Sequence, residues 1–249
     1  LYPGVHWGPD PAVQGPEFRV LGMPLDGTFA ERIAVGVDQL VEAPPHLDFA
    51  GQAALPVAGL TAYRALFTQG RLQAGQTVLI TGIGGGVAVA ALQLAVAAGA
   101  RVLATSSSPE KLARAAAVGA LDGISYKETG WAKTLVARHG AVDLILDGAG
   151  GDGFNELIAM VRPGGRIVSY GATCGPPAKL DLARHFWKQL HLVGCTMGSP
   201  QEFRDLTQFV TQHSLHPVVD SEIPLAAGAT AVASMAGSPQ FGKLILSIP

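Results

Sequence analysis

The sequence predicts an α/β protein with a doubly wound parallel sheet, and three observations support this fold class. From residue 77 onward, short runs of Val, Ile and Leu alternate with longer Ala- and Leu-rich segments. The short runs lack the apolar–polar alternation of half-exposed strands, which is typical of parallel strands covered on both faces. Glycines follow two of the longer segments, at Gly119 and Gly140, where helices commonly end. Because βαβ crossovers are right-handed, this alternation predicts a Rossmann-type sheet.

Six strands and several helices follow from these patterns. We expect strands over residues 77–81, 101–105, 123–126, 142–147, 166–171 and 192–195. We expect helices over residues 109–118, 131–139, 154–161 and 200–212, and an apolar helix over residues 87–98. The start of one helix is well marked, because Ser108, Pro109 and Glu110 supply an N-cap, a proline at the first helical position and an early acid.

The two ends of the chain differ from this pattern. Residues 1 to about 55 are rich in Pro and Gly and contain short strand-like runs such as residues 31–35, which predicts an irregular β-rich domain. The tail from Val218 onward contains a short Ala-rich segment and a final strand over residues 243–248. We expect this tail to leave the sheet and pack against the first region.

Composition excludes several functional classes. The 249 residues carry a formal net charge of -2, which offers no basic field to hold nucleic acid or an anionic membrane. The longest apolar stretch is interrupted by Gln93 and predicts a buried helix, not a membrane span. Two cysteines, Cys174 and Cys195, are too few for a disulfide framework and favour a reducing, cytoplasmic compartment.

A glycine-rich turn between the first strand of the sheet and the apolar helix is the strongest functional signal. Its glycines allow backbone N–H groups to approach a pyrophosphate, which the positive end of the helix then faces. The spacing is Gly82-x-x-Gly85-x-x-Ala88 in place of a strict G-x-G-x-x-G. The candidate pyrophosphate-binding residues are Gly82, Gly84, Gly85, Gly86 and Val87. A plain strand–helix junction is the alternative.

The end of the second strand favours NADPH over NADH. An NAD site commonly places Asp or Glu about 20 residues after the glycines, to accept from the ribose 2′-hydroxyl. Here Ser106 and Ser107 stand at the strand end, and Lys111 and Arg114 follow on one helix face. Hydroxyls and cations without a carboxylate suit a 2′-phosphate. A solvated helix face with a serine N-cap is the other interpretation.

Four further segments resemble the medium-chain dehydrogenase/reductase superfamily, in particular its zinc-independent, quinone-oxidoreductase-like branch, to which zeta-crystallin belongs. They are GTFAE at residues 27–31, AALPVAGLTAY at 53–63, RPGGRIVSYG at 162–171 and FGKL at 241–244. The resemblance covers nearly the whole chain. It implies that residues 1–58 are the C-terminal part of an incomplete, β-rich GroES-like catalytic domain. Residues 59–216 would then form the dinucleotide-binding domain, and residues 217–249 a tail that returns to the first domain.

The resemblance also implies roles for individual residues. Thr61 would lie near the nicotinamide, and Ser106, Lys111 and Tyr126 would surround the adenosine 2′-phosphate. Lys243 would reach the cofactor from the tail. The residues that end the fourth and fifth strands of the sheet would line the ligand site; they are Asp147, Gly148, Ala149, Gly171 and Ala172.

Two departures from the family pattern bear on activity. The chain opens with LYPG, which resembles mid-domain sequence, so we expect a fragment, the ordered remainder of a protein with a disordered segment, or a truncated variant. No metal site is expected, because Val57 and Ala58 stand where the family's alcohol dehydrogenases place a zinc ligand. Cys174 and Cys195 also lack the paired spacing of a structural zinc site.

Taken together, these features predict an NADPH-dependent oxidoreductase that reduces quinones or α,β-unsaturated carbonyl compounds by hydride transfer. No catalytic acid or base is assigned, since the cofactor carries the reaction. A non-catalytic NADPH-binding structural or sensor protein is the first alternative. A zinc alcohol dehydrogenase with its ligands in a missing N-terminal segment is the second. We expect a homodimer, paired through the edge strand at residues 192–195.

Overall fold

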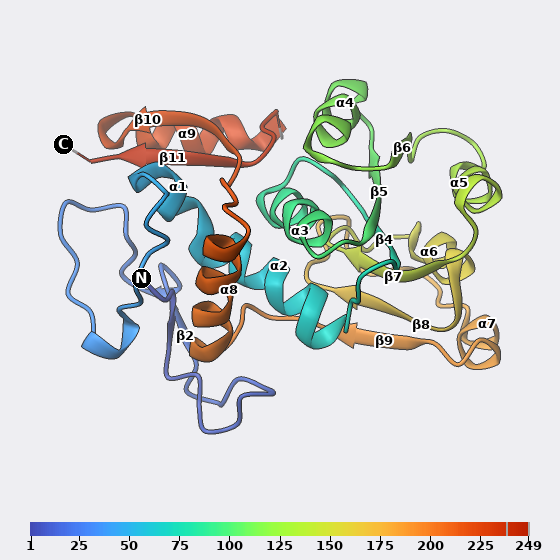
Figure 1. Ribbon diagram of the computed structural model, residues 1–249, viewed down its shortest axis with the longest axis horizontal. Helices are drawn as coiled ribbons and strands as arrows, with labels where there is room; N and C mark the ends of the chain where they lie inside the picture. The colour runs from blue at the N-terminus through green and yellow to red at the C-terminus, as the bar shows by residue number, and fades with distance from the viewer. Residues whose placement is uncertain (238, 249) are drawn as a thin grey trace.

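The computed structural model describes residues 1–237 and 239–248. Its centre is a six-stranded parallel sheet in the order β6-β5-β4-β7-β8-β9, on the right of Figure 1. The predicted doubly wound, Rossmann-type sheet is therefore confirmed. The strands are β4 (Thr77–Ile80), β5 (Arg101–Ser106), β6 (Asp122–Ser125), β7 (Val142–Asp147), β8 (Val161–Ser169) and β9 (His191–Gly194).

Helices cover both faces of this sheet. Side chains that alternate along β4 separate into two hydrophobic clusters, with Val78 and Ile80 in one and Leu79 in the other. The first cluster includes α3 (Gly86–Ala97), and the second includes α5 (Trp131–His139) and α6 (Phe154–Met160). The sheet is thus buried on both sides, which explains its continuous apolar strands.

Local signals in the sequence fix the ends of two long helices. The helix α4 (Pro109–Val118) begins where Ser108 Oγ accepts from Lys111 N at 3.2 Å, and it ends at Gly119 with φ of +117°. The helix α8 (Pro200–Gln212) begins with a capping box between Ser199 and Glu202. A shorter helix, α7 (Leu182–Trp187), precedes β9.

Residues 1–55 contain less β-structure than predicted. The strands β1 (Gly4–Val5), β2 (Arg19–Leu21) and β3 (Pro24–Leu25) form a small sheet. Residues 31–35 belong to none of the described sheets, so the predicted strand there is wrong; without a hydrogen-bonded partner a strand-like run stays irregular. Helix instead runs from α1 (Phe49–Ala54) through α2 (Leu60–Tyr63), with π-helical turns at Leu55–Gly59 and Arg64–Gln69.

The C-terminal tail forms a separate unit beside the first region. The strands β10 (Val219–Pro224) and β11 (Lys243–Ser247) pair in parallel, with α9 (Gly228–Ser234) between them. Both strands contact α1, and Figure 1 shows them on the side of the molecule where the chain begins. The sequence predicted β11 and the helix but missed β10. Residues 238 and 249 of the expected tail lie outside the described residues.

None of the helices in the described part of the chain is both long and apolar enough to span a membrane.

Candidate functional site

The glycine turn after β4 leaves space above the backbone. Gly82 has φ of +62° and Gly84 has φ of +130°, conformations that L side chains rarely adopt. A methyl group placed on Gly82 or on Gly85 would meet no other atom within 4 Å. The neighbouring strand holds the turn in place, because Gly82 N donates to Thr105 Oγ1 at 3.3 Å. The space above Gly82 and Gly85 is therefore open, as the close approach of a pyrophosphate requires.

Lysine side chains cross this turn from two directions. A methyl group on Gly84 would lie 2.7 Å from Lys111 Cδ, so the Lys111 side chain on α4 covers the turn. A methyl group on Gly86 would lie 2.8 Å from Lys243 Cδ, so Lys243 on β11 covers the start of α3. Val87, the next residue, is half-buried. The structure thus brings the predicted glycines and both predicted lysines together.

Hydroxyl groups occupy the end of β5. Ser106 is buried, and its Oγ accepts from Ser108 N at 3.1 Å, whereas Ser107 is exposed. Tyr126 follows β6 and is 47% exposed, and its N donates to Ser106 O at 3.3 Å. Neither Asp nor Glu stands at the end of this strand. The predicted 2′-phosphate residues therefore lie on neighbouring strand ends and on the following helix.

Asp147 at the end of β7 is engaged by the protein itself. Its side chain is buried and accepts from Thr81 Oγ1 at 2.6 Å, Gly150 N at 2.9 Å and Ala149 N at 3.3 Å. These bonds shape the turn that carries Gly148 and Ala149. The Asp147 carboxylate therefore accepts from donors of the protein and holds the turn of the predicted ligand site in place.

The loop after β8 packs against the loop after β7. A methyl group on Gly171 would lie 3.0 Å from Gly148 O, which explains why glycine stands there; Ala172 is exposed. The Tyr170 ring lies directly over Gly148. Burial, and then the nearby Asp147 carboxylate, raise the pKa of Tyr170, so its phenol stays protonated. Sequence reasoning did not select Tyr170, because its role depends on Gly148 of the neighbouring loop.

Thr61 lies between the two π-helical turns that lead into the sheet. It is buried, and its Oγ1 donates to Val57 O at 2.8 Å within the helix. Cys195 Sγ approaches Thr61 O at 3.9 Å, and burial raises the pKa of that thiol to about 12. Irregular helical turns are frequent at functional sites. The hydroxyl proton of Thr61 is nevertheless committed to the helix backbone.

One cation expected to face the 2′-phosphate is engaged by the C-terminal tail instead. Arg114 was predicted to share a phosphate-facing surface with Lys111, but the structure pairs it with Asp220 of the tail at 3.1 Å. The two residues are separated by 106 positions in the sequence, so no local pattern could have indicated this contact.

Comparisons with known proteins identify the family. The zinc-binding dehydrogenase family matches residues 86–212. The zinc-type alcohol dehydrogenase-like protein YogA of Leptosphaeria maculans is 36% identical over 100% of this chain and 74% of its own length. The quinone oxidoreductase of Mus musculus is 30% identical over 89% of this chain and 70% of its own.

Solved structures give the same result. The crystal structure of an NAD-dependent alcohol dehydrogenase superposes with a TM-score of 0.93 and 33% identity, covering 100% of this chain and 75% of that one. The 2-octenoyl-CoA carboxylase reductase CinF, solved in complex with NADP and 2-octenoyl-CoA, superposes with a TM-score of 0.88 and 27% identity. The match covers 93% of this chain and 57% of CinF.

The Rossmann-type sheet and its open glycine turn define a dinucleotide-binding α/β protein. The chain belongs to the zinc-binding dehydrogenase family of the medium-chain dehydrogenase/reductase superfamily. It is an oxidoreductase with a nicotinamide cofactor.

The family's name implies zinc, but the residues in hand do not fit a zinc site. Across residues 1–237 and 239–248, no three His, Cys, Asp or Glu side chains lie together so that they could hold a metal ion. Cys174 is exposed and Cys195 is buried, and neither is in a disulfide.

Proposed function

We propose that this protein is a zinc-independent NADPH-dependent reductase, which transfers a hydride to a quinone or an α,β-unsaturated carbonyl compound. The observation that carries the choice of NADPH is the end of β5, where Ser106 and Ser107 replace an acid and Lys111 crosses the adjacent turn. A carboxylate there would repel a 2′-phosphate, whereas hydroxyls and an ammonium bind one. The substrate class is supported by the quinone oxidoreductase relative and by CinF, which is solved with an enoyl-CoA.

Each part of the cofactor is assigned to residues of this chain. The turn from Gly82 to Val87 and Lys243 hold the pyrophosphate, and Ser106, Ser107, Lys111 and Tyr126 hold the 2′-phosphate. Thr61 and the ends of β7 and β8 lie on the nicotinamide side, and these strand-end residues are Asp147, Gly148, Ala149, Gly171 and Ala172. When bound, NADPH supplies the hydride; the protein supplies orientation and a water-poor site.

The domain boundaries belong to the same proposal. Residues 1–58 form the C-terminal part of a GroES-like catalytic domain, residues 59–216 the cofactor domain, and residues 217–249 the returning tail. The unpaired Cys174 and Cys195 favour a cytoplasmic location, where thiols stay reduced. A non-catalytic NADPH-binding protein is the rival function, because fold alone does not fix activity.

Hydride transfer and cofactor choice are tested together. We expect the protein to oxidise NADPH in the presence of a panel of quinones and enones, with a lower KM for NADPH than for NADH. Ser106→Asp is expected to raise the KM for NADPH about tenfold or more and to favour NADH, because like charges repel while a carboxylate still accepts from Ser108 N. Initial rates with both cofactors measure this.

The control is Ser214→Asp, which adds the same charge at an exposed position after α8. Tight NADPH binding without turnover on any substrate of the panel would favour the non-catalytic rival. Unchanged cofactor preference in Ser106→Asp would contradict the proposed 2′-phosphate site.

A homodimer completes the proposal. Strand β9 lies at the edge of the sheet, where it can pair with its two-fold mate. Next to it, α7 exposes large apolar side chains, with Phe186 66% and Trp187 82% exposed. We expect light scattering at micromolar concentration to give a dimer mass, and Trp187→Lys to shift it toward the monomer. A monomeric wild-type protein would contradict this arrangement.

A further inference from the structure

Arg114 on α4 is held by two residues of the C-terminal tail. Its Nη1 donates to Asp220 Oδ1 at 3.1 Å, and its Nη2 donates to Phe241 O at 3.4 Å. The guanidinium carbon also lies 4.6 Å from the centre of the Phe241 ring, within the range of a cation–π contact. Asp220 Oδ1 accepts a second hydrogen bond from Phe241 N at 3.1 Å. We call Arg114, Asp220 and Phe241 the tail clasp.

The residues that follow the tail clasp reach the glycine turn. Gly242 N donates to Gly84 O at 2.9 Å, and the Lys243 side chain covers Gly86 at the start of α3. Gly242 has φ of +106°, and a methyl group there would overlap the carbonyl oxygen of Val218. The backbone path between Phe241 and Lys243 is therefore tightly fixed. Any contact that locates Phe241 therefore also locates the backbone position from which the Lys243 side chain extends.

The surroundings of the Lys243 ammonium favour the binding of an anion. Its side chain is half-buried, and burial lowers the pKa of its ammonium. No hydrogen bond or ion pair joins this ammonium to another side chain in the described part of the chain. The ammonium and the positive end of the helix repel each other. An anion placed between them attracts both, so the electrostatic interaction becomes favourable.

We propose that the tail clasp positions Lys243 at the N-terminus of α3, so that Arg114 strengthens dinucleotide binding without contacting the 2′-phosphate. This inference rests on the proposed cofactor site. Arg114 directs its donors to Asp220 and Phe241, whereas Lys111 lies over the turn itself. Because β10 and β11 also contact α1, the tail clasp joins the cofactor sheet to the N-terminal region. In Figure 1 the tail and α4 come together at the top of the molecule.

The test compares the dissociation constants of NADPH and NADH in single variants of the full chain, by titration calorimetry. Arg114→Ala is expected to weaken both dinucleotides by the same factor, roughly 5- to 20-fold, because the pyrophosphate contact is common to both. Lys111→Ala is expected to weaken NADPH more than NADH. The matched control is Arg138→Ala, which removes an equally exposed ion pair on α5, with side chains 50% exposed in Arg138 and 48% in Arg114.

A double variant asks whether Arg114 acts through Lys243. Arg114→Ala combined with Lys243→Ala is expected to bind no more weakly than Lys243→Ala alone, since the two residues would serve one contact. Hydrogen exchange gives a readout without cofactor: Arg114→Ala should speed exchange of the amides at residues 241–247, while Arg138→Ala should not.

Each outcome separates this inference from the proposed function. If Arg114→Ala weakens NADPH far more than NADH, then Arg114 touches the 2′-phosphate and the inference is wrong. Unchanged affinity for both, or losses that add in the double variant, would also overturn it while leaving the NADPH site intact. If the wild-type chain binds neither dinucleotide, the proposed function fails, and the inference fails with it.

Discussion

Arg64→Ala is expected to lower the free energy of unfolding by about 3 to 5 kcal/mol, because it leaves Glu202 as a buried charge without its partner. Arg64 Nη1 donates to the two carboxylate oxygens of Glu202 at 2.9 and 2.7 Å. The two side chains are 3% and 10% exposed. Little water can reach Glu202 to replace the lost contact, so the desolvation of the charge is no longer compensated.

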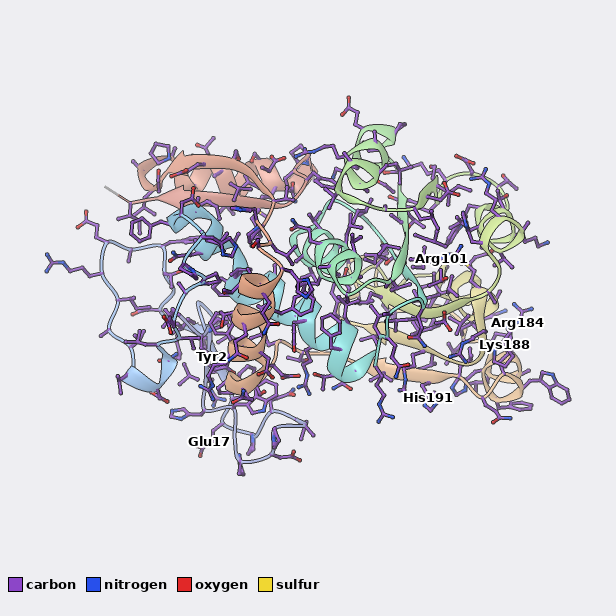
Figure 2. All side chains as sticks on the ribbon, in the orientation of Figure 1. Tyr2, Glu17, Arg101, Arg184, Lys188 and His191 are labelled. Atoms are coloured by element: carbon purple, nitrogen blue, oxygen red, sulfur yellow. The ribbon has the colours of Figure 1, made fainter. Side chains whose placement is uncertain are left out.

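Neighbouring groups make this ion pair the junction of three segments. Thr68 Oγ1 and Ser199 N each donate to Glu202 at 2.6 Å. Arg64 also donates to the Ala12 carbonyl and lies 5.2 Å from the Trp7 ring centre. The pair therefore ties the helix that enters the sheet to the start of α8 and to the N-terminal residues. In Figure 2, Tyr2 lies beside α8 in the same part of the molecule, where its hydroxyl donates to Gly198 O at 2.9 Å.

Urea unfolding followed by circular dichroism measures the effect. Arg138→Ala breaks an exposed pair with Asp122 and is expected to cost no more than about 1 kcal/mol. Arg64→Met combined with Glu202→Leu should cost less than Arg64→Ala alone, since no unpaired charge remains. A free energy of unfolding for Arg64→Ala within about 1 kcal/mol of wild type would show that Glu202 finds water or another partner.

The sequence predicted the sheet and the long helices well because their signals are local. The helices at residues 109–118, 131–139 and 200–212 begin and end where expected. In the first of these, a serine cap, a proline and a left-handed glycine stand within the helix ends themselves. The glycine turn was predictable for the same reason, since its residues are contiguous.

Errors arose where structure depends on distant partners. Strand β10 contains two acids and a proline, a poor strand pattern, and it forms because β11 pairs with it. The helix from Phe49 was missed because the surrounding Pro- and Gly-rich composition favoured turns, although Asp48 caps it by accepting from Gly51 N at 2.8 Å. These cases show tertiary context overriding local preference.

In the candidate site, too, the residues with local sequence signals were predicted, and the contacts between distant segments were not. Ser106, Ser107 and Lys111 could be selected because they lie at the end of one strand or shortly after it in sequence. The partner of Arg114 could not, since Asp220 lies on a separate unit of the chain. Asp147 was selected for the right place, at a strand end, yet its hydrogen bonds to Thr81 and to its own turn were beyond any local pattern.

Asp147→Ala is expected to lower the free energy of unfolding by about 3 to 4 kcal/mol and to weaken NADPH binding about tenfold. The substitution removes the side-chain acceptor of the Gly150 and Ala149 N–H groups, and it leaves the Thr81 hydroxyl only the longer contact to Leu146 O at 3.4 Å. A buried donor that loses its acceptor costs about 1 to 3 kcal/mol. Thr81 is only 7% exposed, and Ala149 and Gly150 are half-buried. Affinity falls with stability because the released turn carries Gly148 and Ala149, which the proposed site places against the cofactor.

Thr81→Val is the companion variant that separates these effects. Alone, it removes one donor and leaves the Asp147 carboxylate its two backbone partners, so we expect a cost of about 1 kcal/mol. Asp147→Ala with Thr81→Val should then cost less than the sum of the single changes, because the buried hydroxyl that had lost its short contact to Asp147 is gone. Urea unfolding gives the stabilities, and calorimetric titration with NADPH gives the affinities.

Strictly additive losses of stability would mean that the 2.6 Å contact between Thr81 and Asp147 contributes no net coupling energy. If Asp147→Ala lowers the stability but leaves the NADPH affinity unchanged, then the turn after β7 does not contribute to cofactor binding.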